Sequence, residues 1–384
     1  MKKTKKYFLG LCLIIFVMLT GCYQSSSVAS NEIIPFDSNL WEIEASESRV
    51  EDYLGENSLF LKGGFATIKD SEFTDGIIEY DIAFGEQRGF LGHVWRLQDF
   101  GNFEHFYMRP HQSGNPDACQ YTTVYNNISS FQLDSGIEES SAMLTYPFNE
   151  WLHVKSIVSG KNAEIYVDDM EKPALVINEL KRDIEPGKVG LFVESDLAPA
   201  HYANFSYTST SNPPLKTEIK PPEKAPEGTV RSWLVSNSFQ EQYLDNKYQL
   251  FIEEEKENLN WTKLVADNSG ITNLSKIQGI TDGKNTVFAR TKIVADRDTI
   301  KQLKFGFSDR VKVYLNGQLL YGGNDAVISR DYRFLGTVGL FDELYLPLKA
   351  GDNELWMAVS EDEFRLGWGL IAQLENLQGV SLSE

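Results

Sequence analysis

The chain has 384 residues and a formal net charge of −19 at pH 7, and 42% of its residues are hydrophobic. This length has room for two ordinary domains with packed cores. The strong negative charge repels phosphate backbones, so it argues against a nucleic-acid partner and against direct docking on anionic lipid.

The first 22 residues have the pattern of an export signal. Four lysines within residues 2–6 precede an uncharged apolar run at residues 7–19. Gly21-Cys22 then supplies a small residue and a thiol at the expected cleavage point. The apolar run is too short for a comfortable membrane span, which favours a cleaved signal over a transmembrane helix.

Residues 19–22 read Leu-Thr-Gly-Cys, which resembles the lipobox of bacterial lipoproteins. That resemblance implies a signal peptide at 1–21 and an acylated Cys22 as the new N-terminus. The acyl chains would then be the protein's membrane attachment. We expect an exported protein anchored in the cell envelope. Tyr23 is not the aspartate associated with inner-membrane retention, so we expect the outer membrane if the cell has one.

The cysteine count excludes an internal disulfide in the mature chain. Of the three cysteines, Cys12 leaves with the signal and Cys22 carries lipid. Cys119 is then alone, and we expect it to be a small buried apolar residue.

Composition divides the rest of the chain into four segments. Residues 22–32 are polar and serine-rich, which predicts a flexible tether. Residues 209–228 contain Pro213, Pro214, Pro221, Pro222 and Pro226, which predicts an extended, semi-stiff linker. The linker separates a predicted domain at 33–208 from a second at 229–380.

Short strands dominate the predicted first domain. Residues 73–84, 90–97, 104–108, 118–125, 151–158 and 163–167 are apolar or alternating runs, with Gly, Pro, Asn and Asp between them. Many short strands with such turns predict an antiparallel β-sandwich. We therefore predict an all-β protein in which a Pro-rich linker joins two sandwich (jelly-roll) domains.

Part of this domain resembles a known family. Residues 149–155 and 163–169, followed by 187–192 and 201–207, resemble the paired and closing strands of laminin G-like, concanavalin A-like lectin domains. One branch of that group is similar to the 3-keto-disaccharide hydrolase family. The resemblance implies a sugar-binding sandwich and leaves an enzymatic function open.

The second domain contains a strong hairpin signal. Asn316-Gly317 lies between two alternating apolar runs, and glycine supplies the positive φ that a type I′ turn needs. With residues 346–359, this segment resembles the galactose-binding-like jelly roll. These motifs are turns, so they indicate a fold and say little about a ligand.

The best candidate site is at residues 104–111. On a strand, His105, Tyr107, Arg109 and His111 share one face, and Phe106 and Met108 share the other. We expect Arg96 beside Arg109, and the next strand to add Gln120 and Tyr125. Such a mixture of aromatic and hydrogen-bonding groups is typical of carbohydrate sites, although a solvated strand face would show the same residues.

An enzyme would need an acid–base pair. By residue type and position, His111 with Asp117 or Glu104 would supply it. The strand that begins Glu79-Tyr-Asp81 resembles the catalytic strand of family 16 glycoside hydrolases, but it lacks that strand's second glutamate. This departure favours binding over catalysis.

We expect no cofactor, and the five histidines are too scattered for zinc. Loop carboxylates at Asp168-Asp169 and Asp267-Asn268 are candidates for a structural calcium ion. The sequence therefore predicts a lipid-anchored protein that binds a glycan through the concave face of its first sandwich. A glycoside or 3-keto-disaccharide hydrolase (or lyase), and a structural or adhesion protein, are the alternatives.

Overall fold

The computed structural model describes residues 32–134, 140–194, 196–222, 224–327, 329–330 and 335–382. The predicted signal peptide, Cys22 and nearly all of the predicted tether lie outside these residues. Almost every element is an antiparallel strand, which confirms the all-β prediction. No helix in the described ranges is long and apolar enough to cross a membrane.

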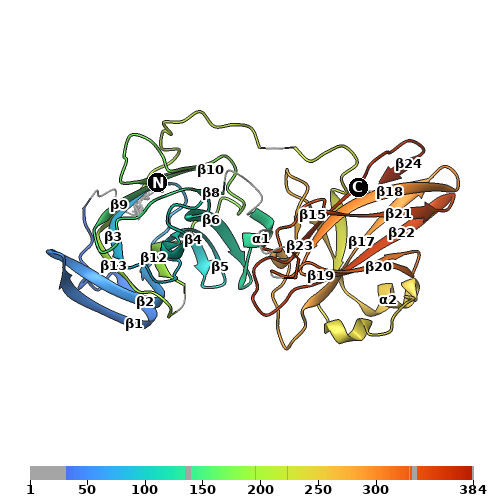
Figure 1. Cartoon of the computed structure of the whole chain (residues 1–384), viewed down its shortest axis with the longest axis horizontal. Helices are drawn as coiled ribbons and strands as arrows, with labels where there is room; N and C mark the ends of the chain where they lie inside the picture. Colours follow the sequence, from blue (N-terminus) through green and yellow to red (C-terminus); the bar gives the residue numbers. More distant parts are fainter. Residues whose placement is uncertain are drawn as a thin grey trace, which may run out of the picture.

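An N-terminal sandwich is built from the first thirteen strands (Figure 1, left). Its elements are β1 (Trp41–Tyr53), β2 (Glu56–Ile68), β3 (Gly76–Phe84), β4 (Leu91–Asp99), β5 (Asn102–Met108), η1 (Pro110–Gln112), β6 (Cys119–Tyr125), β7 (Ile128–Ser129), α1 (Phe131–Asp134), β8 (Ser141–Ala142), β9 (Leu152–Ser159), β10 (Asn162–Val167), β11 (Leu175–Ile177), β12 (Lys188–Val193) and β13 (Ala200–Ser209).

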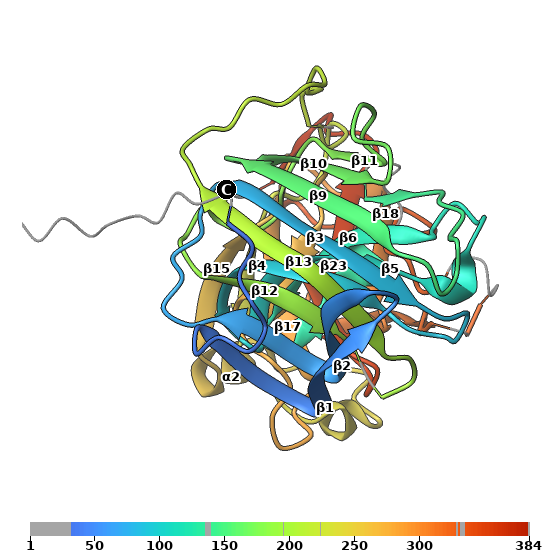
Figure 2. The same ribbon diagram turned by 90° about the vertical axis from the view of Figure 1, so that its left-hand side faces the viewer.

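These strands form one continuous sheet that folds over on itself. Its order is β11-β10-β9-β3-β13-β2-β12-β4-β5-β6-β7, and Figure 2 shows β9, β3, β13 and β2 side by side. Strand β2 belongs to both layers, since residues 59–61 pair with β13 and residues 64–67 pair with β12. Gly63 and Gly64 lie at the crossing with φ values of 55° and 149°, where a residue with a Cβ would be strained.

The core of this sandwich lies between the two layers. Apolar side chains such as Trp95, Phe106 and Tyr80 fill it, each with no exposed surface. Cys119 is fully buried in the same core as a free thiol, as the sequence predicted. Packing of aromatic and branched side chains therefore holds this body together.

A C-terminal sandwich follows (Figure 1, right). Its elements are β14 (Ser232–Ser236), η2 (Glu241–Leu244), α2 (Ile252–Asn258), β15 (Trp261–Val265), β16 (Thr272–Asn273), η3 (Leu274–Lys276), β17 (Thr286–Ala295), β18 (Thr299–Ser308), β19 (Arg310–Leu315), β20 (Gln318–Asn324), β21 (Asp342–Leu348), β22 (Gly351–Ser360), β23 (Gly369–Leu374) and β24 (Val380–Leu382).

Two sheets enclose the second core. One has the order β15-β14-β17-β22-β19-β20, with β24 paired to β17, and the other has the order β16-β23-β18-β21. Asn316 and Gly317 connect β19 to β20 with φ values of 50° and 83°, which confirms the predicted hairpin. The chain passes from the second sheet to the first between β18 and β19, at Asp309.

The two sandwiches pack directly against each other through β7 and α1. Ile128 is fully buried in the core of the C-terminal sandwich, and Leu133 packs with Val338 and Ile371. The Asn126 side chain also donates a hydrogen bond of 2.8 Å to the Ser275 carbonyl. Figure 1 shows α1 between the two bodies, whereas the segment after β13 runs along one side. The sequence analysis did not foresee this contact.

Candidate functional site

A pocket of about 400 Å³ lies where the outer face of the N-terminal sandwich meets the C-terminal sandwich. Its floor consists of phenylalanines from neighbouring strands and a turn. Phe65 is central, with its ring centroid 4.8 Å from those of Phe100 and Phe192 and 5.4 Å from that of Phe103. These rings present an apolar surface to whatever enters the pocket.

Polar groups of β5 and β6 adjoin this aromatic floor. Alternation along β5 places His105 and Tyr107 on the pocket face and Phe106 in the core, as predicted. The Tyr107 hydroxyl donates a hydrogen bond of 2.6 Å to Gln120 Oε1 on β6. The structure therefore brings together two of the predicted site residues, with Tyr107 lining the pocket.

His105 has unused hydrogen-bonding capacity. Its side chain lines the pocket, and neither ring nitrogen has a hydrogen-bond partner among the described residues. Burial lowers the pKa of His105 to about 3, so its imidazole is neutral at pH 7. A neutral imidazole offers one donor and one acceptor, which matches a hydroxyl group.

Charged side chains lie at one end of the pocket. Arg88, Arg109 and Glu194 line it there. Arg109 is buried and pairs with Asp117, but its Nε atom has no partner among the described residues. The Glu194 side chain has exposed surface, but protein atoms surround much of its carboxyl group. This desolvation raises the pKa of Glu194, and the positive charges of Arg109 and Arg88 partly offset the rise.

His111 lies beside this end of the pocket, but its predicted place on a strand is wrong. Strand β5 ends at Met108, and Pro110 begins the turn η1 because proline has no N–H for the sheet. The His111 ring instead packs edge-on against Phe90, with centroids 5.6 Å apart. Burial, then the charges of Arg109 and Arg88, lower its pKa to about 4.

The predicted place of Arg96 beside Arg109 is also wrong. Arg96 has a φ of 46°, and the pairing of β4 with β5 shifts register after Trp95. This bulge breaks the alternation, so both Trp95 and Arg96 point into the sandwich while Leu97 joins the outer aromatic cluster. Arg96 is therefore absent from the pocket lining.

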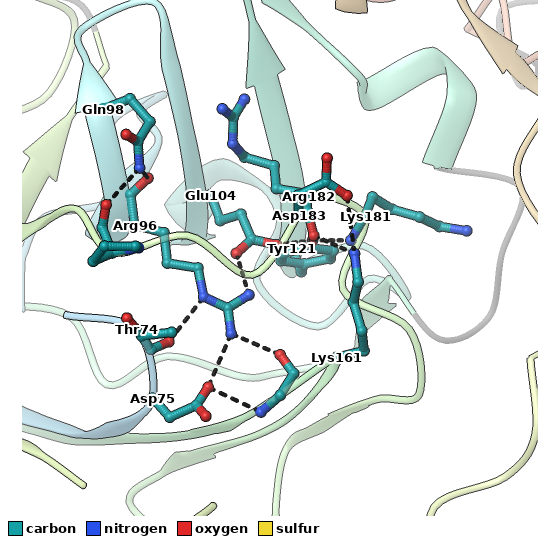
Figure 3. A network of polar contacts seen from close by, with 12 residues as sticks. Thr74, Asp75, Arg96, Gln98, Glu104, Tyr121, Lys161, Lys181, Arg182 and Asp183 are labelled. Carbon is teal, nitrogen blue, oxygen red and sulfur yellow. Dashed lines mark hydrogen bonds and ion pairs between the residues drawn. The ribbon is translucent and has the colours of Figure 1, made fainter. Parts of the chain in front are cut away.

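The interior of the sandwich holds the Arg96 guanidinium in a closed network (Figure 3). It forms ion pairs with Glu104 at 3.1 Å and with Asp75 at 3.0 Å. It also donates hydrogen bonds to the carbonyl oxygens of Thr74 and Gly160. Arg96 thus ties both layers of the sandwich together.

Two further candidates face away from the pocket. Glu104 is fully buried in the Arg96 network and accepts a hydrogen bond of 2.7 Å from the Tyr121 hydroxyl. Tyr125 donates a hydrogen bond to the Lys181 carbonyl and carries the Arg182 guanidinium over its ring. Neither residue lines the pocket.

The C-terminal sandwich supplies the opposite wall of the pocket, which the sequence analysis missed. Val327, Leu335, Phe364, Arg365 and Leu366 contribute to it. These residues lie more than two hundred positions after β5 in the sequence. No local pattern could have connected them to the candidate site.

A second pocket, of about 650 Å³, opens beside β11. Its lining combines polar and charged side chains, such as Asp134, Lys181 and Glu179, with apolar ones, such as Leu175 and Ile177. The Lys181 ammonium already pairs with Glu179 and Asp267. We favour the smaller pocket as the functional site because it combines an aromatic floor with unpartnered polar atoms.

The loop carboxylates suggested for calcium already have partners within the protein. Asp168 accepts the backbone N–H of His153, and Asp169 accepts those of Glu171 and Lys172. Asp267 accepts the Ile271 N–H and pairs with Lys181. The acidic cluster of the described residues lies elsewhere, at Asp309, Glu361 and Asp362.

The fold and the pocket define an all-β protein with two antiparallel sandwiches and an aromatic-floored pocket at their junction. No protein-family model matches the chain, and no curated protein matches it.

Several solved structures are similar over less than half of this chain. The carbohydrate-binding module CBM66 from Bacillus subtilis is 17% identical, with a TM-score of 0.34, over 45% of this chain and 98% of that one. The cellulose-induced protein Cip1 is 13% identical, with a TM-score of 0.33, over 46% and 94%. A Bacillus licheniformis β-glucanase is 10% identical, with a TM-score of 0.33, over 46% and 96%. Likenesses of this size carry no argument about what the chain does.

Proposed function

We propose that the protein binds a carbohydrate in the pocket between its two sandwiches. The observation that carries this proposal is a floor of phenylalanine rings beside His105, whose ring nitrogens have no partner among the described residues. The apolar face of a sugar ring can stack on the phenylalanines while its hydroxyl groups bond to His105 and to the charged groups of Arg88 and Glu194.

The pocket supports binding better than glycoside hydrolysis. Hydrolysis in most families needs two carboxyl groups facing the bond, about 5–10 Å apart. Glu194 is the one carboxylate among the described lining residues. Of the predicted acid–base candidates, Asp117 pairs with Arg109 and Glu104 lies inside the sandwich. Hydrolase and adhesion functions remain the competing proposals.

A glycan array followed by calorimetry with the purified full chain tests the binding proposal. Glu194→Gln and Arg88→Gln should each weaken binding of the best glycan about tenfold, since a hydrogen bond to a charged group contributes about 1.5–3 kcal/mol. Both side chains are exposed, so folding should be unaffected. Glu86→Gln, in the same loop as Arg88 but outside the pocket, is the matched control.

The outcomes separate the competing functions. The proposal would be contradicted if no glycan bound. It would also be contradicted if the three variants and Arg109→Ala all bound the glycan as tightly as the wild-type protein. Release of reducing sugar that is lost in Glu194→Gln would favour the hydrolase instead.

We also propose that acylated Cys22 anchors the protein in the envelope, as the lipobox resemblance implies. Labelled palmitate should enter the wild-type protein in cells and should not enter a Cys22→Ser variant. Equal labelling of both proteins would contradict the anchor.

A further inference from the structure

Three acidic side chains meet at the end of the C-terminal sandwich that contacts α1. Ligand oxygens of Asp309, Glu361 and Asp362 all lie within 4.8 Å of one another. Asp309 connects β18 to β19, and Glu361 directly follows β22. The exposed fractions of Asp309 and Glu361 are 1% and 0%, so the cluster is an interior feature rather than a surface acidic patch.

The Asp309 carboxylate is held by hydrogen bonds. Asp309 Oδ1 accepts from Gln132 Nε2 at 3.3 Å and from Ser308 Oγ at 3.2 Å. Asp309 Oδ2 accepts from the backbone N–H of Asp362 at 2.8 Å. These contacts fix the position of the Asp309 carboxylate beside the other two acids.

Glu361 is different, because neither of its carboxylate oxygens has a hydrogen-bond partner among the described residues. The backbone N–H groups of Leu366 and Gly367 interact with it only weakly. A fully buried carboxylate without a partner is rare in folded proteins and calls for an ion or another ligand.

The described part of the chain places no lysine or arginine in an ion pair with any of the three acids. Arg310 is adjacent in sequence, but its guanidinium binds Glu241 at 2.8 Å. Three carboxyl groups therefore lie close together with no ion-paired cation among the described residues, and a bound cation would supply the missing partner.

We propose that Asp309, Glu361 and Asp362 bind one calcium ion. Calcium prefers several oxygen ligands, accepts mono- and bidentate carboxylates, and tolerates irregular geometry. Magnesium retains several waters and is less suited to a buried cluster.

The ion would connect this cluster to the sugar pocket. The loop after Glu361 carries Phe364, Arg365 and Leu366, which line the pocket. The same loop accepts backbone hydrogen bonds of 2.9 Å from Ser129 and from Gln132. This connection rests on the proposed function, and it predicts that calcium strengthens glycan binding by holding the loop against the N-terminal sandwich.

Calorimetric titration of CaCl2 into the chelator-treated full chain tests the ion site without any glycan. One ion should bind per chain, and saturating calcium should raise Tm by about 5 °C. MgCl2 should bind at least tenfold more weakly. Glu361→Gln and Asp309→Asn should remove the calcium response, whereas Glu363→Gln, at an exposed neighbouring position, should keep it.

Absence of calcium binding by the wild-type chain, or an undiminished response in Glu361→Gln, would overturn the proposal. If the variants at the buried positions fail to fold, Asp362→Asn tests the same site at a partly exposed position. Calcium binding without any glycan binding would support the ion site and contradict the function proposed for the pocket. Glycan affinity that is equal with and without bound calcium would contradict the connection alone.

Discussion

The two sandwiches bury charge in opposite ways. In the N-terminal sandwich, Arg96 is 1% exposed and its guanidinium meets two carboxylates and two backbone carbonyls. In the C-terminal sandwich, Glu361 is 0% exposed and has no hydrogen-bond partner among the described residues. Burial alone therefore does not mark a functional group. A closed network indicates a structural role, whereas an unpartnered buried carboxyl group such as Glu361 is the kind of feature from which a ligand site can be proposed.

Replacing Arg96, the cation of the closed network, should give the largest loss of stability. Arg96→Met leaves Glu104 buried without its charge partner, and breaking a buried ion pair in this way costs about 3–5 kcal/mol. Urea unfolding followed by tryptophan fluorescence would measure the loss.

The matched control is an arginine with two partners at the surface. Arg49 pairs with Glu47 and Glu51, and its side chain is 44% exposed. Arg49→Met should cost much less than Arg96→Met, because exposed ion pairs contribute little. Equal losses in the two variants would remove the distinction between the closed network and a surface pair.

The contact between the sandwiches should give the next largest effect. Ile128 comes from the N-terminal sandwich but is fully buried in the C-terminal core, so Ile128→Ala should lower the free energy of unfolding by about 3 kcal/mol. Ile300→Ala, at a position that is 69% exposed, should change it by less than about 0.5 kcal/mol. Identical unfolding curves for the two variants would show that Ile128 is not part of that core.

Acid should weaken the N-terminal sandwich through His105. Its folded pKa of about 3 lies below the ordinary value of 6.5, so its contribution is present above pH 6.5 and is lost as pH falls toward 3. Between pH 6.5 and 5 the loss should be about 2 kcal/mol. His105→Phe should show a smaller loss over that interval in urea titrations, and an unchanged pH dependence would refute this assignment.

His153 should give a smaller effect of the opposite sign. Its hydrogen bond to Asp81 raises the pKa of this half-exposed histidine. Its stabilising contribution is therefore full below about pH 6.5 and is lost as pH rises through the raised pKa. His153→Gln should lower Tm at pH 5.5 and leave it almost unchanged at pH 8.5. A larger decrease at pH 8.5 would contradict this sign.

Local patterns predicted the elements, because strands and hairpins are specified by nearby residues. The alternation at 104–108 and the pair Asn316-Gly317 were interpreted correctly. The β1–β2 hairpin was not predicted. In the structure its turn, Leu54-Gly55, has the positive φ values of a tight turn. The acidic run at 253–257 is typical of a solvated segment, yet it lies in α2, where Glu255 is buried against Tyr243 and Lys247.

The site was predicted only in part, for two physical reasons. The first reason is that side chains alternate between the two faces of a strand only while the strand is regular. The bulge at Arg96 interrupts β4, and Pro110 ends the extended segment after β5. The second reason is distance along the chain. Asp309 and Glu361 are 52 positions apart, and the antiparallel pairing of β19 with β22, in which Arg310 lies opposite Ser360, brings them together.

The insertion of Ile128 has a consequence for how the chain folds. The segment that completes the C-terminal core is synthesised about a hundred residues before the first strand of that core, Ser232–Ser236. Domains generally fold in order of synthesis, so the first body can present this apolar segment as a template on which the later strands collapse. Until they do, Ile128 and Leu133 are exposed, and a chaperone that binds apolar segments would find its binding surface there.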